Sequence, residues 1–338
     1  MSRFVVTGHA GFIGFHVARQ LLEHGHEVLG VDAITDYYDP SLKRSRLQSL
    51  RHFDKLVGEE FELEDADRLL RSITNFEPDV IIHLAAQAGV RYSLEAPFAY
   101  IQANLVGTFN LLEAARISKP KHLLLASSSS IYGGNQSLPW SETDRTDSPM
   151  SLYAATKKGT EDLAHSYSSL WGIPTTAFRF FTVYGPMGRP DMALYKFVKA
   201  AFDGDAIDVY GHGKMRRDFT YIDDLVRAIV ALINTPPVKN SPVGTADSLS
   251  PVAPYRSVNL GGGVPVELMS FIESVEQATG RTLKKNMLPM QMGDVLETYS
   301  ETTLLRELIG EIPRTPVTTG VVSFVDWYKS YFHIDSTT

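Results

Sequence analysis

A glycine-rich turn near the start of the chain limits what the chain can fold into more than any other feature. Residues 4–8 (FVVTG) are an apolar run that stops at glycine, and residues 9–25 carry apolar side chains at helical spacing. The turn GHAGFIG, residues 8–14, therefore lies between a predicted strand and a predicted helix. Glycines here permit a tight turn and a close approach of the backbone to a pyrophosphate, whose charge the helix N-terminus favours. The pattern predicts a dinucleotide-binding turn.

An acidic residue at the end of the next apolar run bears on which dinucleotide binds. Residues 26–32 (HEVLGVD) end in Asp32. A carboxylate at this place accepts hydrogen bonds from ribose hydroxyls and repels a 2′-phosphate, which favours NAD over NADP. Two cations follow, Lys43 and Arg44. They either affect the choice of cofactor or are solvated residues at the start of a helix.

Apolar runs alternate with helical patterns through the first half of the chain. Buried strands are predicted at residues 78–86, 121–129 and 175–181, and helices at 103–117 and 156–172. Strands that are continuous apolar runs belong to parallel sheets with helices on both faces. We therefore predict an α/β fold with a doubly wound parallel sheet of the Rossmann type.

After about residue 185 the alternation becomes irregular. Residues 235–257 hold five prolines and many small polar residues, which predicts a surface loop. The sequence predicts an NAD-binding Rossmann domain over residues 1–180 and a smaller α/β substrate domain over residues 181–338. We expect the chain to cross between the two more than once.

Composition excludes several classes of function. The net charge of the 338 residues is −7, with acidic and basic residues interspersed, so no nucleic acid partner is expected.

The lack of cysteine excludes disulfides and thiolate chemistry and fits a reducing compartment. The ten histidines show no metal-binding spacing, so no metal is expected. No stretch approaches the roughly 20 apolar residues of a membrane span, and the N-terminus lacks the apolar core of a signal peptide. We expect a cytoplasmic protein with no membrane partner.

Two polar patterns follow the predicted strand at residues 121–129. Residues 126–134 (ASSSSIYGG) place serines at the carboxyl end of a parallel strand, where open α/β sheets bind ligands. Tyr153 and Lys157 lie four positions apart, on one face of a predicted helix. Each pattern alone is weak, because a Tyr and a Lys at this spacing occur by chance in many helices. Together with the glycine-rich turn, and in this order, they predict a catalytic site beside a cofactor.

Motifs along nearly the whole chain carry a resemblance to a known family. They are GHAGFIG, HLAAQAG (83–89), NLVGTFNLLEAA (104–115), SSSSIYG, YAATK (153–157), RFFTVYGPMGRPDM (179–192) and RRDFTYIDDL (216–225). With these motifs the sequence resembles the extended short-chain dehydrogenase/reductase superfamily, and within it the sugar-nucleotide epimerases. The segments DYYDPSLKRSRL (36–47), AAQAGVRYS (85–93) and GRPDMA (188–193) are similar to those of the epimerases that act on UDP-glucuronate.

The resemblance implies an activity and three catalytic roles. A member of this family converts UDP-glucuronic acid into UDP-galacturonic acid through a transient 4-keto intermediate, with NAD as a cofactor that is not consumed. Tyr153 is then the base at the sugar 4-hydroxyl, Lys157 lowers the pKa of Tyr153 and holds the nicotinamide ribose, and Ser128 hydrogen-bonds the reacting oxygen. Because a free tyrosine titrates at about pH 10, a neighbouring ammonium and a positive nicotinamide are needed to favour the phenolate.

The resemblance also implies a set of residues that bind the cofactor, in addition to Tyr153 and Lys157. They are Gly8, Gly11, Phe12, Ile13, Gly14, Asp32, Lys43, Glu62, Leu63, Leu84, Ala85, Ala86, Gln87, Asn104, Ala126 and Ser127.

A second implied set binds the UDP-sugar. A 4-keto hexuronic acid is a β-keto acid, so an epimerase must hold the carboxylate still or lose CO₂, and hydroxyl and guanidinium donors suit that task. The residues assigned to the carboxylate and sugar are Ser128, Ser129, Ser130, Thr182 and Arg189.

Three further residues are assigned to the substrate with an alternative for each. Arg91 lies near the substrate or pairs with Glu95, at the helical spacing i,i+4. Arg217 contacts the UDP phosphates and Asp294 the uridine ribose, or both are surface ion-pair residues. For Arg189 the alternative is a structural pair with Asp191.

Three positions depart from the pattern of the family. Ala33 stands where Asn is usual and Glu62 where Asp is usual, which concerns the affinity for the cofactor. Met187 stands where a large aromatic is usual, which concerns the sugar pocket.

Competing interpretations stay open. A UDP-glucuronate decarboxylase uses the same first oxidation and then releases CO₂, whereas a neutral UDP-hexose 4-epimerase has no use for Arg189 or Thr182. A non-catalytic NAD-sensing module has no need to keep Ser128, Tyr153 and Lys157 together. By analogy with the family, a homodimer is expected through the two helices predicted at residues 103–117 and 156–172.

Overall fold

Seven parallel strands form the central sheet of the computed structural model, which describes residues 1–290, 296–311 and 314–334. Every neighbouring pair in this sheet is parallel. The predicted doubly wound Rossmann sheet is thereby confirmed. In spatial order its strands are β10 (Tyr255–Leu260), β6 (Thr175–Phe180), β5 (His122–Ser128), β4 (Val80–His83), β1 (Arg3–Thr7), β2 (Glu27–Asp32) and β3 (Leu56–Glu60).

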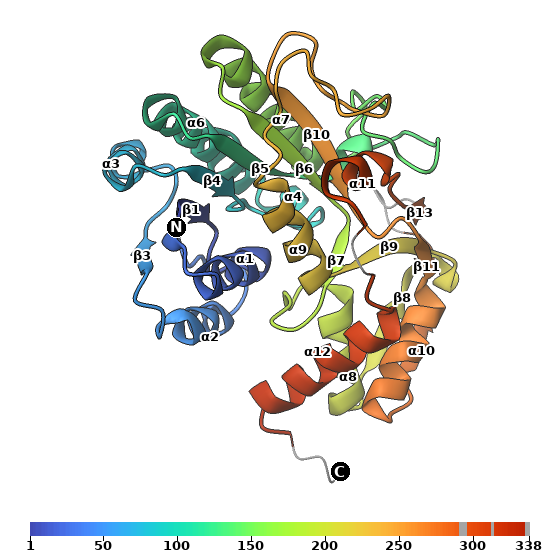
Figure 1. Ribbon diagram of the computed structural model, residues 1–338. Helices are drawn as coiled ribbons and strands as arrows, with labels where there is room; N and C mark the ends of the chain where they lie inside the picture. The colour runs from blue at the N-terminus through green and yellow to red at the C-terminus, as the bar shows by residue number, and fades with distance from the viewer. Residues whose placement is uncertain (291–295, 312–313, 335–338) are drawn as a thin grey trace.

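Helices cover both faces of this sheet (Figure 1). All seven residues of β5 are buried, which explains why the central strands are continuous apolar runs in the sequence. One apolar core lies under each layer of helices. The first layer holds α3 (Ala66–Phe76), α6 (Gly107–Ser118) and α7 (Leu152–Trp171), and the second holds α1 (Phe12–Glu23), α2 (Pro40–Leu50) and α9 (Ile222–Leu232).

A smaller group of elements packs beside the carboxyl ends of the central strands (Figure 1). Its strands are β7 (Thr182–Tyr184), β8 (Ala206–Val209), β9 (Arg216–Tyr221), β11 (Pro265–Glu267), β12 (Lys284–Met287) and β13 (Glu297–Thr298). Its helices are α8 (Ala193–Asp203), α10 (Leu268–Thr279), α11 (Thr303–Ile309) and α12 (Val317–Tyr331). Short helices complete the chain: α4 (Tyr92–Glu95), α5 (Pro97–Tyr100), a π-helix (Ile101–Val106) and 3₁₀ turns at Ser129–Tyr132 and Tyr210–Gly213.

Two elements from the second half of the chain belong to the main sheet and its helical layers. β10 pairs with β6 along its length, from Tyr255 opposite Thr175 to Leu260 opposite Phe180. α9 packs against α1 and shares its apolar core. The sequence predicts a division between domains at residue 180. The chain returns to the seven-stranded sheet and its helices well beyond that residue.

Several predicted elements differ from the observed ones at their ends; the helix predicted over 156–172, for example, begins at Leu152. The strand predicted over residues 78–86 stops at His83. The Leu84 N–H donates to both the carbonyl and the hydroxyl of Thr7, the last residue of β1, and the Ala85 N–H donates to the Thr7 hydroxyl, so the ladder does not continue. The helix predicted over 103–117 begins with the π-helical turn before α6. The loop predicted at residues 235–257 gives way to β10 three residues early.

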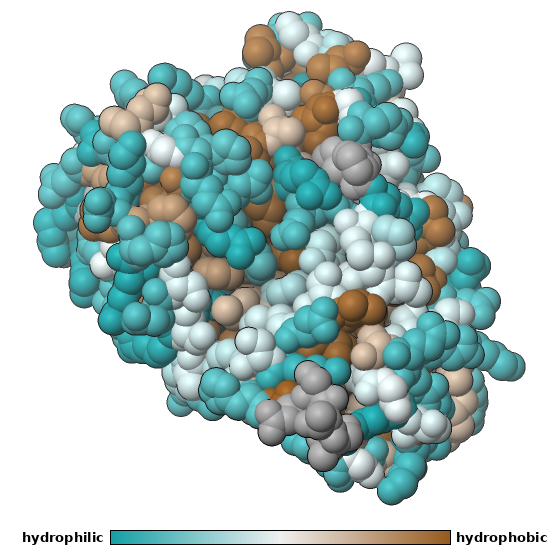
Figure 2. Space-filling model, turned by 60° about the horizontal axis from the view of Figure 1, so that its bottom comes forward, coloured by the Kyte–Doolittle hydropathy of each residue, from teal (hydrophilic) through white to brown (hydrophobic). Residues whose placement is uncertain are grey.

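The molecular surface is polar over much of the face shown in Figure 2, with hydrophobic residues in separate patches. Across the described ranges, no helix is long and apolar enough to cross a membrane.

Candidate active site

A cavity of about 1390 Å³ runs along the carboxyl ends of β1, β2, β4 and β5 and continues toward the smaller group of elements. Open α/β sheets bind their ligands at this edge. Nearly all of the residues assigned from the sequence line this cavity. Among the described residues the one that does not is Asn104, and Asp294 lies outside the described residues.

The glycine-rich turn is packed too closely for side chains. Gly8 has a φ of +76°, and a Cβ on it would lie 2.8 Å from the Ala85 nitrogen. A Cβ on Gly14 would lie 2.0 Å from the Gly8 carbonyl oxygen. The turn therefore brings bare backbone and the N-terminus of α1, with Phe12 and Ile13, to the wall of the cavity. Because helix N-termini leave N–H groups without intrahelical partners, this wall fits a pyrophosphate.

The carboxylate of Asp32 is fixed at the end of β2. One oxygen accepts from the Ala10 nitrogen at 3.0 Å and the other from the Ile34 nitrogen at 2.9 Å. These bonds leave further lone pairs on the carboxylate for the two hydroxyls of a ribose. Asp32 and its neighbour Ala33 both line the cavity, as the NAD assignment requires.

Lys43 is buried, which corrects the interpretation of this residue as a solvated helix start. Its ammonium donates to the Thr35 carbonyl at 2.7 Å and to the Thr35 hydroxyl at 2.9 Å, and it lines the cavity. Burial lowers the pKa of Lys43, although the nearby Asp32 carboxylate raises it. Arg44, in contrast, is exposed and pairs with Glu60 at 2.6 Å.

Asn104 supports the cavity without lining it. Its amide oxygen accepts from the Gln87 nitrogen at 2.8 Å, and its amide nitrogen donates to the Gln87 carbonyl and to the Thr156 hydroxyl at 3.0 Å. Since Thr156 lies on α7 between Tyr153 and Lys157, Asn104 joins the segment after β4 to the catalytic helix. The predicted cofactor contact is thus replaced by a structural bridge.

Ser128, Tyr153 and Lys157 meet on one wall of the cavity, at the end of β5 and the start of α7. The Lys157 ammonium donates to the Ala126 carbonyl at 2.9 Å. Burial lowers the pKa of Lys157 to about 8, although the charge of Glu161 raises it. The buried hydroxyl of Ser127 has no hydrogen-bond partner in the described chain, which fits a ligand at this wall.

Opposing effects act on the pKa of Tyr153 in the protein alone. Burial raises the pKa of its phenol, while a hydrogen bond from Ser128 and the charge of Arg189 lower it. The Lys157 ammonium donates to the Ala126 carbonyl, and its effect on the pKa of Tyr153 stays a prediction. The sequence did not indicate that Arg189 acts on the catalytic tyrosine.

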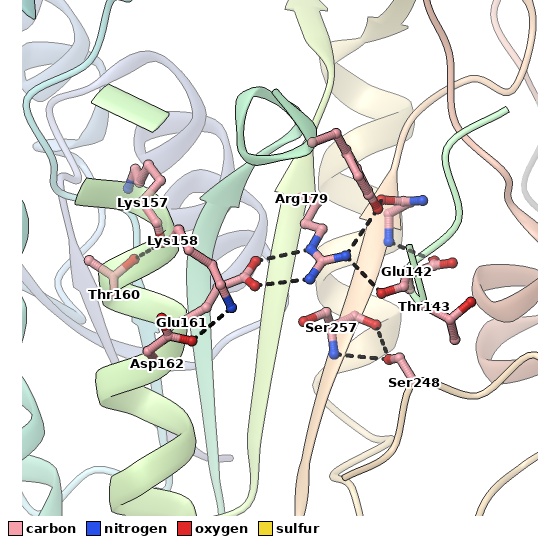
Figure 3. A network of polar contacts seen from close by, with 12 residues as sticks. Glu142, Thr143, Lys157, Lys158, Thr160, Glu161, Asp162, Arg179, Ser248 and Ser257 are labelled. Carbon is pink, nitrogen blue, oxygen red and sulfur yellow. Dashed lines mark hydrogen bonds and ion pairs between the residues drawn. The ribbon is translucent and has the colours of Figure 1, made fainter. Parts of the chain in front are cut away.

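A buried ion pair lies behind the catalytic helix (Figure 3). Glu161, one turn after Lys157 on α7, accepts two bonds of 3.0 Å from the Arg179 guanidinium on β6. The same guanidinium donates to the Tyr132 hydroxyl at 3.1 Å and to the Glu142 carbonyl at 2.9 Å. Arg179 therefore joins α7 to the 3₁₀ turn that carries Ser129 and Ser130.

Two of the residues assigned to the sugar, Thr182 and Arg189, come from the chain after β6 and also line the cavity. Thr182 begins β7, and Arg189 follows on the next segment with its Nε donating to Asp191 at 2.9 Å. Arg189 therefore pairs with Asp191, as the structural interpretation requires, and also lines the cavity, where its contact with the substrate stays a prediction. Asp191 in turn accepts from the Tyr37 hydroxyl at 3.1 Å.

Two further residues assigned to the substrate, Arg91 and Arg217, contact aromatic and backbone groups. The Arg91 guanidinium lies 5.0 Å from the centroid of the Tyr210 ring. Arg217 donates to the Arg216 carbonyl at 2.9 Å and to the Leu296 carbonyl at 3.1 Å. Both side chains line the cavity.

Two tyrosines of the site, Tyr37 and Tyr100, were not assigned to it from the sequence. Tyr37 lines the cavity and holds Asp191, while Tyr100 donates to the carbonyls of the segment after β4 and has its ring 6.1 Å from that of Tyr153. Sequence alone does not show these contacts because they join segments far apart in the chain. The side chain of Met187, expected to concern the sugar pocket, packs in the core and does not line the cavity.

The fold and the site together define a Rossmann-fold enzyme of the short-chain dehydrogenase type, with a dinucleotide turn, a strand-end serine and a Tyr-x-x-x-Lys helix on one cavity. Residues 4–243 match the model of the NAD dependent epimerase/dehydratase family, and the chain belongs to that family.

Several relatives resemble the chain over almost its whole length. It is 55% identical to a probable UDP-glucuronate 4-epimerase of Rhizobium meliloti, with 99% of each chain covered. It is 41% identical to UDP-glucuronate 4-epimerase 4 of Arabidopsis thaliana, covering 98% of this chain and 76% of that one. The crystal structure of the UDP-glucuronic acid 4-epimerase of Bacillus cereus, in complex with UDP-glucuronic acid and NAD, superposes with a TM-score of 0.85 at 31% identity, covering 97% of this chain and 99% of the other.

Proposed function

We propose that this enzyme is an NAD-dependent UDP-glucuronate 4-epimerase, which interconverts UDP-glucuronic acid and UDP-galacturonic acid through a transient 4-keto sugar. The observation that carries the proposal is the meeting of Ser128, Tyr153 and Lys157 with Arg189 on one cavity. Two of the relatives that resemble the chain over nearly its full length are a probable UDP-glucuronate 4-epimerase and a UDP-glucuronate 4-epimerase, and one solved relative binds UDP-glucuronic acid and NAD.

Tyr153, Ser128 and Lys157 have different roles in the reaction at C4 of the sugar. Bound NAD supplies a hydride acceptor that later returns the hydride, and its positive nicotinamide favours a phenolate beside it. Tyr153 takes the proton of the 4-hydroxyl and gives it back after the sugar has presented its other face. Ser128 donates a hydrogen bond to the same 4-oxygen of the sugar. Its hydrogen bond to Tyr153 keeps its hydroxyl beside that base. Lys157, fixed on Ala126, stands where it can hold the nicotinamide ribose.

The carboxylate of the substrate needs its own restraint. Because the 4-keto intermediate is a β-keto acid, free rotation of the carboxylate would permit loss of CO₂. We assign this restraint to Ser129, Ser130, Thr182 and Arg189, which line the same part of the cavity. The remaining residues assigned to the cofactor and to UDP in the sequence keep their proposed roles, apart from Asn104.

Product analysis tests the proposal and separates its rivals. Purified protein is incubated with UDP-glucuronate, and the products are resolved by NMR. We expect UDP-galacturonate. UDP-xylose or a 4-keto pentose would identify a decarboxylase, and turnover of UDP-glucose but not of UDP-glucuronate would identify a neutral hexose epimerase. Binding of NAD without turnover of any UDP-sugar would identify a sensing module.

We also propose that the chain forms a homodimer through α6 and α7. These helices expose Phe109 (45%), Ile117 (49%) and Leu170 (69%), large apolar side chains that a second copy of the chain would bury. Light scattering on the wild type and on Leu170→Glu tests this: a dimeric mass that falls to the monomer in the variant supports the interface, and a monomeric wild type contradicts it.

The absence of cysteine from the sequence supports a cytoplasmic location, where thiols are kept reduced.

A further inference from the structure

The segment that carries Arg189 into the cavity, residues 185–191, has little regular structure of its own. It joins β7 to α8, and it contains two residues with left-handed backbone, Gly185 at φ +143° and Met187 at φ +60°. A left-handed methionine is strained unless its surroundings hold it. This segment is held by His16 and Arg46, which hydrogen-bond to residues more than 140 positions later in the sequence.

His16 holds the start of the segment. It is buried on α1, with Nε2 3.0 Å from the Pro186 carbonyl oxygen. Its other nitrogen, Nδ1, lies 3.3 Å from the Arg19 guanidinium, which can only donate. Nδ1 is therefore the acceptor and Nε2 carries the hydrogen that is donated to Pro186. Burial lowers the pKa of His16 to about 3, which keeps this neutral form.

Arg46 holds the left-handed residue itself. Its guanidinium, on α2, is fully buried and donates to the Met187 carbonyl at 2.6 Å, to the Ala10 carbonyl at 2.8 Å and to the Tyr38 hydroxyl at 2.8 Å. Within the described part of the chain, no carboxylate forms an ion pair with it. A buried cation without a carboxylate is costly, and the three hydrogen bonds of Arg46 offset part of that cost.

The contact with Ala10 ties the segment to the cofactor turn. Ala10 lies within the glycine-rich turn, and its nitrogen donates to Asp32. At the other end of the segment, the Tyr37 hydroxyl donates to Asp191, which holds the Arg189 guanidinium. One continuous set of hydrogen bonds thus runs from the dinucleotide turn through Arg46 to the segment that positions Arg189 near Tyr153.

We propose that Arg46 and His16 are positioning residues that fix residues 185–191 on the cofactor turn and thereby set the place of Arg189 beside Tyr153 and the substrate carboxylate. The part that concerns the carboxylate rests on the proposed function. Neither side chain lines the cavity, so both act through the backbone that they hold.

The test compares a buried guanidinium with its exposed neighbour. Arg46→Met removes the three bonds and keeps a long apolar stem, while Arg44→Met, two positions away, removes a surface pair and is the control. We expect Arg46→Met to weaken binding of UDP-glucuronate about tenfold in calorimetry and to raise KM more than it lowers kcat. Binding of UDP-glucose, which lacks the carboxylate, should stay within about twofold of the wild type for both variants.

His16 supplies a second pair of variants that does not bury or remove a charge. His16→Gln keeps a side-chain amide that can donate to Pro186, and His16→Phe removes the donor at similar volume. We expect His16→Phe to repeat the loss of selectivity for UDP-glucuronate and His16→Gln to restore most of it. Equal losses for UDP-glucose and UDP-glucuronate, or no change for either, would overturn the proposal.

Hydrogen exchange gives a readout that is independent of turnover. In full-length protein, the backbone amides of residues 185–191 should exchange faster in Arg46→Met and His16→Phe than in wild type and Arg44→Met. Unchanged exchange contradicts the proposal even if the enzyme proves to act on another sugar. Lack of turnover of UDP-glucuronate by the wild type, with faster exchange in the variants, contradicts the proposed function alone.

Discussion

At the scale of single residues, Tyr153 is the group on which the chemistry depends. Burial raises the pKa of its phenol, and two neighbours, Ser128 and Arg189, oppose that effect. We predict that Tyr153→Phe lowers kcat by about 10²–10⁴-fold, the usual contribution of a positioned base. Its binding of UDP in calorimetry should match the wild type, because the lost hydroxyl serves the reacting oxygen. A variant with full turnover would contradict the mechanism.

Glu142 is a buried carboxyl whose protonation affects stability. Burial raises its pKa to about 7, although bonds such as the one from the Asn259 nitrogen, at 2.8 Å, lower it. In the unfolded chain the carboxyl titrates at its ordinary, lower pKa, so the folded state keeps its proton longer and loses stability as pH rises toward 7.

Glu142→Gln isolates this effect, because its amide oxygen can still accept from Asn259. We predict that the variant gains stability relative to wild type between pH 5 and pH 8, by at most about 3 kcal/mol. Thermal midpoints of both proteins, measured across that range, give the difference directly. A difference that does not change with pH would show that Glu142 is already ionised at pH 5.

Sequence was most informative for residues whose role depends on local pattern. The glycine-rich turn, Asp32 and the Tyr153–Lys157 spacing are all short-range features, and the structure places each of them on the cavity. Roles that depend on long-range contacts were not accessible. Asn104 has the polarity of a ligand-binding residue, but its amide is used by Gln87 and Thr156.

At the scale of elements, the buried pair of Glu161 and Arg179 fixes α7 on the sheet. Removing one partner leaves the other charge buried, which costs about 3–5 kcal/mol. We therefore predict a large fall in the free energy of unfolding for Glu161→Gln. The matched control is Asp162→Asn on the same helix, which breaks the surface pair with Lys158 and should cost less than about 1 kcal/mol. Denaturant unfolding of both variants compares the two pairs, and equal losses would contradict the assignment.

Helices and strands were predicted best where the spacing of apolar residues stays the same along the whole segment. The helix predicted over residues 156–172 and the five strands with apolar runs were confirmed, whereas element ends depended on tertiary contacts. The observed helix, α7, begins earlier than predicted, at Leu152, and so includes Tyr153. β4 stops where Thr7 captures the next two N–H groups, and no local signal marks that point.

At the scale of the whole molecule, the main sheet is completed by β10, which covers the edge of β6. The chain beyond residue 180 also supplies α9 to the core over α1. We predict that the full chain unfolds in one transition, with the same midpoint by far-UV circular dichroism and by tryptophan fluorescence. Trp171 and Trp327 lie in α7 and α12, so fluorescence reports on both parts of the molecule. Two separated transitions would show that the parts unfold independently.

In the proposed mechanism, the configuration at C4 changes by removal and return of one hydrogen within the site. Turnover of UDP-glucuronate that carries deuterium at C4, in ordinary water and with the products resolved by NMR, shows whether this happens. We predict UDP-galacturonate that keeps its deuterium at C4. Loss of the deuterium to solvent, or a product that has lost CO₂, would contradict it.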